Sequence, residues 1–146
     1  MLEREQLVPA PPGEAFRFFA EPENLSRVMP QGVHFSILSV GGTPMRAGTR
    51  IEYQIRLQGV PHRWLAEIVA FEPPHRCVDL QLRGPYRYWR HEHAFEAAGG
   101  GTLVRDRVDY QLPLGALGRL AHPFVARQLQ RIVDERRDAI AHCFAG

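Results

Sequence analysis

Two histidines separated by one residue stand in the middle of a segment that alternates like a β-strand. His91 and His93 share their parity with Trp89 and Phe95, and charged residues such as Glu92 occupy the positions between them. Side chains of a strand point alternately to its two faces, so the charged positions predict a solvent face and the histidines an inward one. Imidazoles among aromatic rings can transfer protons or orient the polar group of a ligand. This inward face is therefore where the sequence could do chemistry.

A carboxylate is expected opposite these histidines. The glycine turn at 99–101 joins the histidine strand to the next strand and sets His93 opposite Asp106 and His91 opposite Val108. An imidazole and a carboxylate on paired strands can satisfy each other's hydrogen bonds, which reduces the cost of burying both. The pairing predicts a polar cluster on an otherwise apolar face.

The preceding strand supplies a second carboxylate. The turn at Gly84 and Pro85, which joins this strand to the histidine strand, sets Asp79 opposite His91 and Gln81 opposite Trp89. This placement depends on the turn at 73–74, because a slip of one residue there would send Asp79 and Gln81 to the solvent face. We favour the inward placement of both side chains.

Three roles are open for this polar cluster. It can be a structural network under the sheet, a patch that orients the head group of a ligand, or a set of general acids and bases. An unpaired buried polar group costs about 1–3 kcal/mol, so a face that only packs would rarely carry several. For a catalytic role the candidate residues are His91, His93, Asp106 and Asp79.

The His-x-His spacing also raises the question of a metal. Two imidazoles with Asp106 could form a facial triad, and metal-binding cupins follow His-x-His with a glutamate. Here Glu96 comes too early and its parity points outward, and no second histidine motif follows. We therefore predict no metal and no other cofactor. A hydrolytic triad is not expected either, because the sequence has no Gly-x-Ser-x-Gly elbow.

Alternating apolar positions predict an antiparallel sheet around the histidine strand. The strands at 49–57 and 62–71 are expected to pair with Ile55 opposite Trp64 and Tyr53 opposite Ala66, which places apolar residues on apolar residues. In the strand at 33–40, Val33, Phe35, Ile37 and Ser39 alternate with the other residues. The predicted strands are 3–8, 33–40, 49–57, 62–71, 76–83, the histidine strand and 102–112.

Two short helices and one long helix complete the predicted elements. Apolar residues at helical spacing occupy 14–30, where Pro22 divides the region and Pro30 ends it. From Leu117 onward apolar residues recur at three- and four-residue steps, which predicts about twenty residues of helix with one apolar face. Pro123 either begins this helix or kinks a longer one. The long helix is the only element large enough to cover the sheet.

A curved sheet around a helix leaves a space between them, and the inward residues predict its walls. The sheet is expected to supply Tyr53, Ile55, Trp64, Ile68, Trp89, Phe95, Val108 and Tyr110. The long helix is expected to close the space with Phe124, Gln128, Leu129 and Ile132. A polar spot that orients a ligand is expected from Asp79, Gln81, His91, His93 and Asp106.

Composition indicates an ordinary globular protein. The chain has 146 residues, 45% of them hydrophobic and 23% charged, which fits one domain over 1–146. Its net charge of +2 and lack of a basic run exclude a typical nucleic-acid tract. No apolar run approaches a membrane span, and the N-terminal residues lack the apolar core of a signal peptide, so we expect a cytoplasmic protein without membrane insertion. Cys77 and Cys143 are expected to be reduced thiols.

The order of elements and several short segments resemble the START-like (SRPBCC, helix-grip) superfamily, in its bacterial polyketide cyclase/dehydrase and lipid-transport-like branch. The segments are Pro11 and Pro12 with Phe16 and Phe19, Asn24 and Leu25, residues 45–49, residues 83–86 with Trp89, Gly101 and Thr102 with Asp106, and residues 112–115.

The resemblance implies an α+β helix-grip fold: a curved antiparallel sheet of about seven strands around a long C-terminal helix, with two short helices after the first strand. It also implies a hydrophobic cavity between sheet and helix, but it supplies no catalytic motif. We therefore expect binding, transport or sequestration of a lipid, isoprenoid or aromatic polyketide. The alternatives are a cyclase or dehydratase that uses the same imidazoles, and an accessory module whose cavity is incidental.

Overall fold

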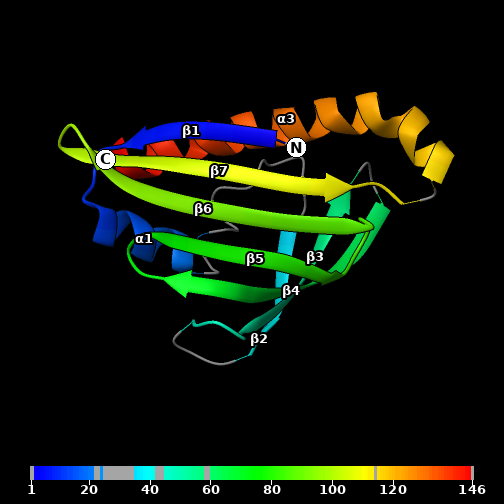
Figure 1. The fold of residues 1–146 in the computed structure, drawn as a ribbon, viewed down its shortest axis with the longest axis horizontal. Coiled ribbons are helices and arrows are strands. Elements are labelled where there is room, and N and C mark those ends of the chain that lie inside the picture. The colour runs from blue at the N-terminus through cyan, green and yellow to red at the C-terminus, as the bar shows by residue number, and fades with distance from the viewer. Residues whose placement is uncertain are drawn as a thin grey trace.

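A curved antiparallel sheet forms the main layer of the computed structural model, which describes residues 2–21, 24, 35–41, 45–57, 60–113 and 115–145 (Figure 1). Within these residues seven strands pair in the order β1-β7-β6-β5-β4-β3-β2. Their bounds are β1 Leu2–Val8, β2 Phe35–Val40, β3 Arg50–Leu57, β4 Val60–Glu72, β5 Arg76–Arg83, β6 Tyr88–Ala98 and β7 Gly101–Gln111. Strands β2 to β7 thus form a meander, and β1 pairs with β7.

The described helices are α1, Pro12–Ala20, and α3, Gly115–Ala145. Figure 1 shows α3 lying along the sheet beside β1 and β7, with its C-terminal end near α1. The rings of Phe18 and Phe144, 4.8 Å apart, join the two helices there. This is the predicted α+β helix-grip fold. The second short helix was predicted within 22–30, where only Asn24 is described, so that prediction lies outside the described residues.

Helix α1 places two aromatic side chains beside the sheet. Pro12 stands at its first position, where a fixed φ and a missing N–H suit the start of a helix. Phe16 is buried, and its ring lies 5.2 Å from that of Phe95 on β6. This contact fixes the rotation of the helix, so that the following Phe18 and Phe19 border the space between sheet and α3.

The register around the histidines is the predicted one. His93 pairs with Asp106 and His91 with Val108 between β6 and β7, and Asp79 pairs with His91 between β5 and β6. Because the turns on both sides of β6 have the expected lengths, all these side chains keep their inward parity.

The predicted register between β3 and β4 is wrong by two residues. Leu57 pairs with Val60 and Tyr53 with Trp64, whereas the prediction placed Ile55 opposite Trp64. The turn leaves only two residues between the paired strand ends, a shorter connection than the alternation alone suggested. A shift of two residues preserves the side-chain parity, so the inward face is correct although its cross-strand partners differ.

The predicted alternation that puts Ser39 on the same face as Phe35 and Ile37 is also wrong. The pairing of β2 with β3 shifts register between Ile37 and Ser39, as a β-bulge does. The extra residue reverses the faces after the bulge, so Ser39 is exposed and Val40 is half-buried.

The outer face of the sheet is less uniformly exposed than predicted. Arg105 and Arg107 are exposed as expected, whereas Arg90 and Glu92 are half-buried. Glu92 accepts a hydrogen bond of 2.8 Å from Nη1 of Arg76, which covers part of its carboxylate.

Helix α3 is longer than predicted. It spans 31 residues with Pro123 inside, so of the two alternatives the proline lies within a longer helix rather than at its start. The extra length lets one helix run along most of the sheet, as Figure 1 shows.

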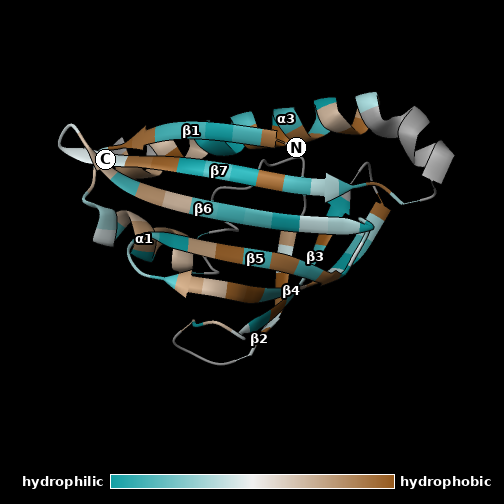
Figure 2. Cartoon of the chain, viewed as in Figure 1, coloured by the Kyte–Doolittle hydropathy of each residue, from teal (hydrophilic) through white to brown (hydrophobic). Residues whose placement is uncertain are grey.

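Two clusters of buried side chains fill most of the space between sheet and helices. Figure 2 shows broad hydrophobic and hydrophilic segments along β7, whereas β6 is hydrophilic over most of its length. The α1 cluster consists of Val8, Ala10, Ala15, Phe16, Ile68, Cys77, Phe95, Val104 and Ile140. The aromatic cluster consists of Leu2, Ile55, Trp64, Ala66, Tyr86, Val108 and Leu129, with Tyr53, Trp89 and Tyr110 packed against it.

Candidate functional site

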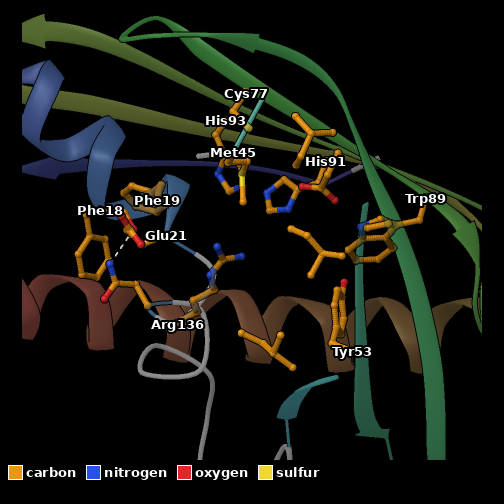
Figure 3. A pocket seen from close by; sticks show the side chains of 16 residues that line it. Phe18, Phe19, Glu21, Met45, Tyr53, Cys77, Trp89, His91, His93 and Arg136 are labelled. Carbon is orange, nitrogen blue, oxygen red and sulfur yellow. Dashed lines mark hydrogen bonds between the residues drawn. The ribbon is translucent and has the colours of Figure 1, made fainter. Parts of the chain in front are cut away.

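A partly open cavity of about 120 Å³ lies between the sheet and the C-terminal half of α3. Figure 3 shows side chains converging on it from the strands, from α3 and from α1. Most of its wall is apolar, and polar side chains border it from the sheet, from α3 and from the residues after α1. The lining residues are Phe18, Phe19, Glu21, Asn24, Ile37, Met45, Ile51, Tyr53, Ala66, Ile68, Cys77, Asp79, Trp89, His91, His93 and Arg136.

Two imidazoles and a carboxylate meet at the sheet side of the cavity. The ring centroids of the buried His91 and His93 lie 3.9 Å apart. Oδ1 of Asp106 lies 3.2 Å from Nε2 of His91 and 2.6 Å from Nδ1 of His93. The His91 imidazole N–H can donate a hydrogen bond to this oxygen. Nδ1 of His93 is close to the same oxygen, but the angle between them is unsuitable for a hydrogen bond. Asp106 does not line the cavity, so it holds both rings from outside.

Burial and charge act in opposite directions on this cluster. Burial alone would raise the pKa of Asp106, but attraction to His93 and the hydrogen bond from His91 hold that pKa well below its ordinary value. Burial lowers the pKa of His93, and the charges of His91 and Arg136 add to this effect against the attraction of Asp106. Asp106 is thus the charged member at neutral pH, and His93 is a neutral imidazole that can accept a proton or a hydrogen bond.

Asp79, His91 and His93 place possible metal-ligating atoms close to one another. One possible ligand atom from each of Asp79, His91 and His93 lies within 4.8 Å of the others. Two imidazoles and a carboxylate could hold a divalent cation. The guanidinium of Arg136 borders the same cavity, however, and its positive charge opposes a second cation there. The absence of a metal therefore stays a prediction.

Aromatic and aliphatic side chains form the rest of the wall. The ring of Phe19 lies 5.6 Å from that of His93, so α1 closes the cavity beside the imidazoles. Phe18 and Met45 border the same side, as Figure 3 shows. Burial, and next the charge of Asp79, raise the pKa of Tyr53 well above its ordinary value. Its hydroxyl therefore stays protonated and can donate a hydrogen bond.

The structure brings only part of the predicted site to the cavity. The predicted residues that line it are Tyr53, Ile68, Asp79, Trp89, His91 and His93. Those that lie outside its lining are Ile55, Trp64, Gln81, Phe95, Asp106, Val108, Tyr110, Phe124, Gln128, Leu129 and Ile132. Whether any of them binds a ligand stays a prediction.

Trp64 fills space that the prediction left open. Its indole stacks on Tyr53 at a centroid distance of 5.6 Å and meets Trp89 edge-on at 5.1 Å and Tyr86 at 5.7 Å. Tyr110 lies 6.0 Å from Tyr86 in the same group. Because these rings pack against one another, Trp64 and Tyr110 lie behind the cavity wall and do not line the cavity.

Gln81 stabilises a loop instead of joining the polar spot. Its Nε2 donates a hydrogen bond of 2.6 Å to the carbonyl of Tyr86, and its Oε1 accepts one of 3.3 Å from the Tyr86 N–H. Both ends of the amide are thereby used, which holds the loop before β6 against β5. The predicted cavity-facing role of Gln81 is not what the structure shows.

The helix residues predicted to close the cavity lie too near the start of α3. Phe124 is 62% exposed, and Leu129 is 6% exposed within the aromatic cluster. Gln128 and Ile132 are half-buried outside the lining. Among the described side chains of α3, the cavity is lined by Arg136 instead. The cavity thus lies about two helical turns beyond the predicted position.

Arg136 was missed, although the sequence carries a signal for it. It follows Leu129 by seven residues and precedes Ile140 by four, which is the spacing of one helix face. Leu129 and Ile140 are buried and Val133 is half-buried, so Arg136 interrupts an apolar stripe. A charged residue on a core-facing stripe is an anomaly that needs a partner or a ligand.

A family model described as "Polyketide cyclase / dehydrase and lipid transport" matches residues 2–142. The chain belongs to this family. The described activities concern hydrophobic molecules, so the family is one that binds hydrophobic ligands, which agrees with the apolar wall of the cavity. The comparison with curated proteins found no match.

Solved structures show the same fold. TTHA0849 from Thermus thermophilus is 21% identical with a TM-score of 0.77, covering 97% of this chain and 94% of its own. CV1439 from Chromobacterium violaceum is 14% identical with a TM-score of 0.78, covering 99% and 97%. Ara h 8.0201 is 19% identical with a TM-score of 0.64, covering 95% of each chain. At these identities the likeness concerns the fold alone.

A search of the described helices for an apolar stretch long enough to cross a membrane found none.

Proposed function

We propose that this family member binds a hydrophobic small molecule in the cavity and carries or sequesters it. The observation that supports this most is the cavity itself: it is partly open, its wall is mostly apolar, and a few polar side chains, among them the two imidazoles, border it. A site of this composition holds the body of a ligand by apolar contact and fixes its orientation through a few polar groups. The imidazoles of His91 and His93 are the orienting groups of this proposal.

The size of the cavity limits the ligand. Its volume of about 120 Å³ is below the roughly 300–1,000 Å³ of a pocket for a drug-sized ligand. An engineered cavity of about 150 Å³ binds benzene. The enclosed part of the ligand is therefore about one ring or a short branched chain. An isoprenoid or one ring of an aromatic polyketide fits this better than a whole acyl chain, and a longer ligand would extend through the opening.

A cyclase or dehydratase is the second candidate, and the contact between His93 and Asp106 favours it. A neutral imidazole whose Nδ1 lies 2.6 Å from a carboxylate outside the cavity is a candidate general base. The same imidazole borders the cavity, so it would face a bound substrate.

Native mass spectrometry of the purified protein, searching for a co-purified small molecule, tests binding directly. A neutral dye that fluoresces in apolar surroundings should also bind and be displaced by an apolar competitor. His93→Phe should change ligand selectivity more than overall affinity, and the exposed His75→Phe should change neither. Turnover of a candidate substrate that His93→Phe abolishes while binding persists would favour the enzyme. Neither a bound molecule nor dye uptake would favour an accessory module.

A further inference from the structure

We infer that Arg136 makes the cavity selective for small apolar molecules that carry a carboxylate. This inference rests on the proposed function and names the ligand class of the same cavity. It adds a cation to a site whose predicted polar groups were imidazoles and carboxylates.

The position of Arg136 on α3 points its side chain toward the sheet. It shares one helix face with Leu129 and Ile140, which are 6% and 2% exposed. Figure 3 shows the Arg136 side chain reaching from α3 toward the centre of the cavity, with its guanidinium on the side of the two imidazoles. A long cationic side chain on a buried stripe ordinarily bends out to water, so an inward orientation is unusual.

Arg136 has no counter-ion in the described part of the chain. None of the ion pairs found among these residues includes it, and its buried Nε has no hydrogen-bond partner there. Its neighbour Asp134 instead pairs with Arg4 of β1 at 3.1 Å. A partly buried cation without a partner is unfavourable for the protein alone. An anionic ligand would remove that cost.

None of the described acidic groups near the cavity forms an ion pair with Arg136, so its guanidinium is available to a ligand. Asp106 lies outside the lining and contacts both imidazoles. It borders a separate small hollow together with Arg136, but no ion pair joins the two among the described residues. Asp79 and Glu21 do line the cavity, but neither lies within ion-pair distance of Arg136, and Glu21 is exposed.

A carboxylate is the anion that suits this geometry best. Its two oxygens match the planar fork of a guanidinium, which can donate two parallel hydrogen bonds. Most of the remaining wall is apolar and encloses about one ring, so the matching ligand is a compact apolar acid.

The inference is tested with two ligands of the same shape, 3-phenylpropanoate and its neutral amide, 3-phenylpropanamide. Isothermal titration calorimetry on the full chain should show the acid binding about tenfold more tightly, as expected for a charge-assisted pair that is partly shielded from water. Arg136→Gln should abolish this difference while leaving the affinity for the amide within about twofold. Arg136→Lys should keep only part of the preference, since an ammonium lacks the fork. Arg131→Gln, an exposed position on the same helix, should behave as the wild type.

The outcomes separate this inference from the proposed function. Equal binding of acid and amide by the wild type would overturn the inference and leave apolar binding intact. A preference for the acid that persists in Arg136→Gln would also overturn it. Failure of both ligands to bind the folded wild type would overturn the proposed function together with the inference. Should Arg136→Gln unfold, the acid preference of the wild type and its reduction in Arg136→Lys decide the matter.

Discussion

Two neighbouring regions between sheet and helix are built from similar inward-facing residues, yet one is solid and the other is hollow. In the aromatic cluster, Trp64 packs against Tyr86 and Leu129 of α3 completes the group. About two helical turns after Leu129, the same face of α3 carries Arg136, which lines the cavity. The sheet supplies large rings to both regions. The difference therefore comes from what the opposite layer places against them.

This contrast shows that inward parity alone does not define a ligand site. An aromatic ring on the inner face of the sheet can be packed against other side chains or can line a cavity. Which of the two occurs depends on whether the residue of α3 opposite the ring extends far enough to contact it. Leu129 reaches the rings and excludes a cavity, whereas a guanidinium that needs a polar partner does not complete an apolar core.

Trp64→Ala should have the largest effect. Removing a buried ring from a packed cluster costs about 3–5 kcal/mol of unfolding free energy, and urea titration should show this as a lower midpoint. Trp89→Ala is the matched control, because Trp89 is half-buried and borders the cavity, so it should lose less stability. A smaller loss for Trp64→Ala than for Trp89→Ala would reverse the assignment of the two regions.

Leu129→Ala should cost about 2–5 kcal/mol of unfolding free energy, since Leu129 fills the aromatic cluster from α3. Phe124→Ala, five residues earlier, should change it by about 0.5 kcal/mol or less because that ring is 62% exposed. Thermal and urea unfolding measure both. Similar losses for the two variants would mean that the start of α3 packs on the sheet, as the sequence had suggested.

Trp89→Ala should weaken binding of an apolar ligand about tenfold, because it removes part of the cavity wall. Trp64→Ala, measured at a temperature where it is folded, should weaken binding less, since Trp64 does not line the cavity. Dye displacement compares the two. Loss of binding confined to Trp64→Ala would place the ligand in the aromatic cluster.

Arg136→Leu should raise the unfolding free energy by about 1 kcal/mol while removing any preference for acidic ligands. It replaces an unpaired, partly buried cation with an apolar residue on an apolar stripe. Arg131→Leu at an exposed position should give no such gain. If Arg136→Leu instead destabilises the chain, Arg136 has a structural role.

The two thiols should differ in reactivity. Burial, and next the charge of Asp79, raise the pKa of Cys77 to about 12, so at pH 8 only about one thiol in ten thousand is ionised. At pH 8 its alkylation should be slow in the native chain and fast in denaturant, and the native rate should rise about tenfold per pH unit. In Cys143→Ser, where Cys77 is the remaining thiol, rapid labelling of the native chain at pH 8 would show that Cys77 is accessible.

Much of the fold follows from local patterns in the sequence. Strict alternation through His91 and His93 fixes their face, and short turns on both sides of β6 fix the pairing with Asp106 and Asp79. The pairing of Tyr53 with Trp64 was missed because two registers that differ by two residues bury the same face.

The position of the cavity could not be obtained in the same way. It depends on how far α3 extends and which of its residues lies opposite the imidazoles, and these are relations between distant segments. The sequence places Leu129 and Arg136 on one face but does not say which lies opposite His93. Phe18 and Phe19 border the cavity because α1 packs on the sheet, in part through the contact of Phe16 with Phe95 of β6, and no periodicity encodes that contact.

The most direct test locates a bound ligand by nuclear magnetic resonance. With 3-phenylpropanoate bound to protein carrying labelled Ile, Leu and Met methyl groups, intermolecular nuclear Overhauser effects report which methyls it touches. The account predicts contacts to Met45, Ile51 and Ile68, which line the cavity, and none to Ile55 or Leu129 in the aromatic cluster. Contacts to Ile55 and Leu129 without contacts to Ile68 would contradict it.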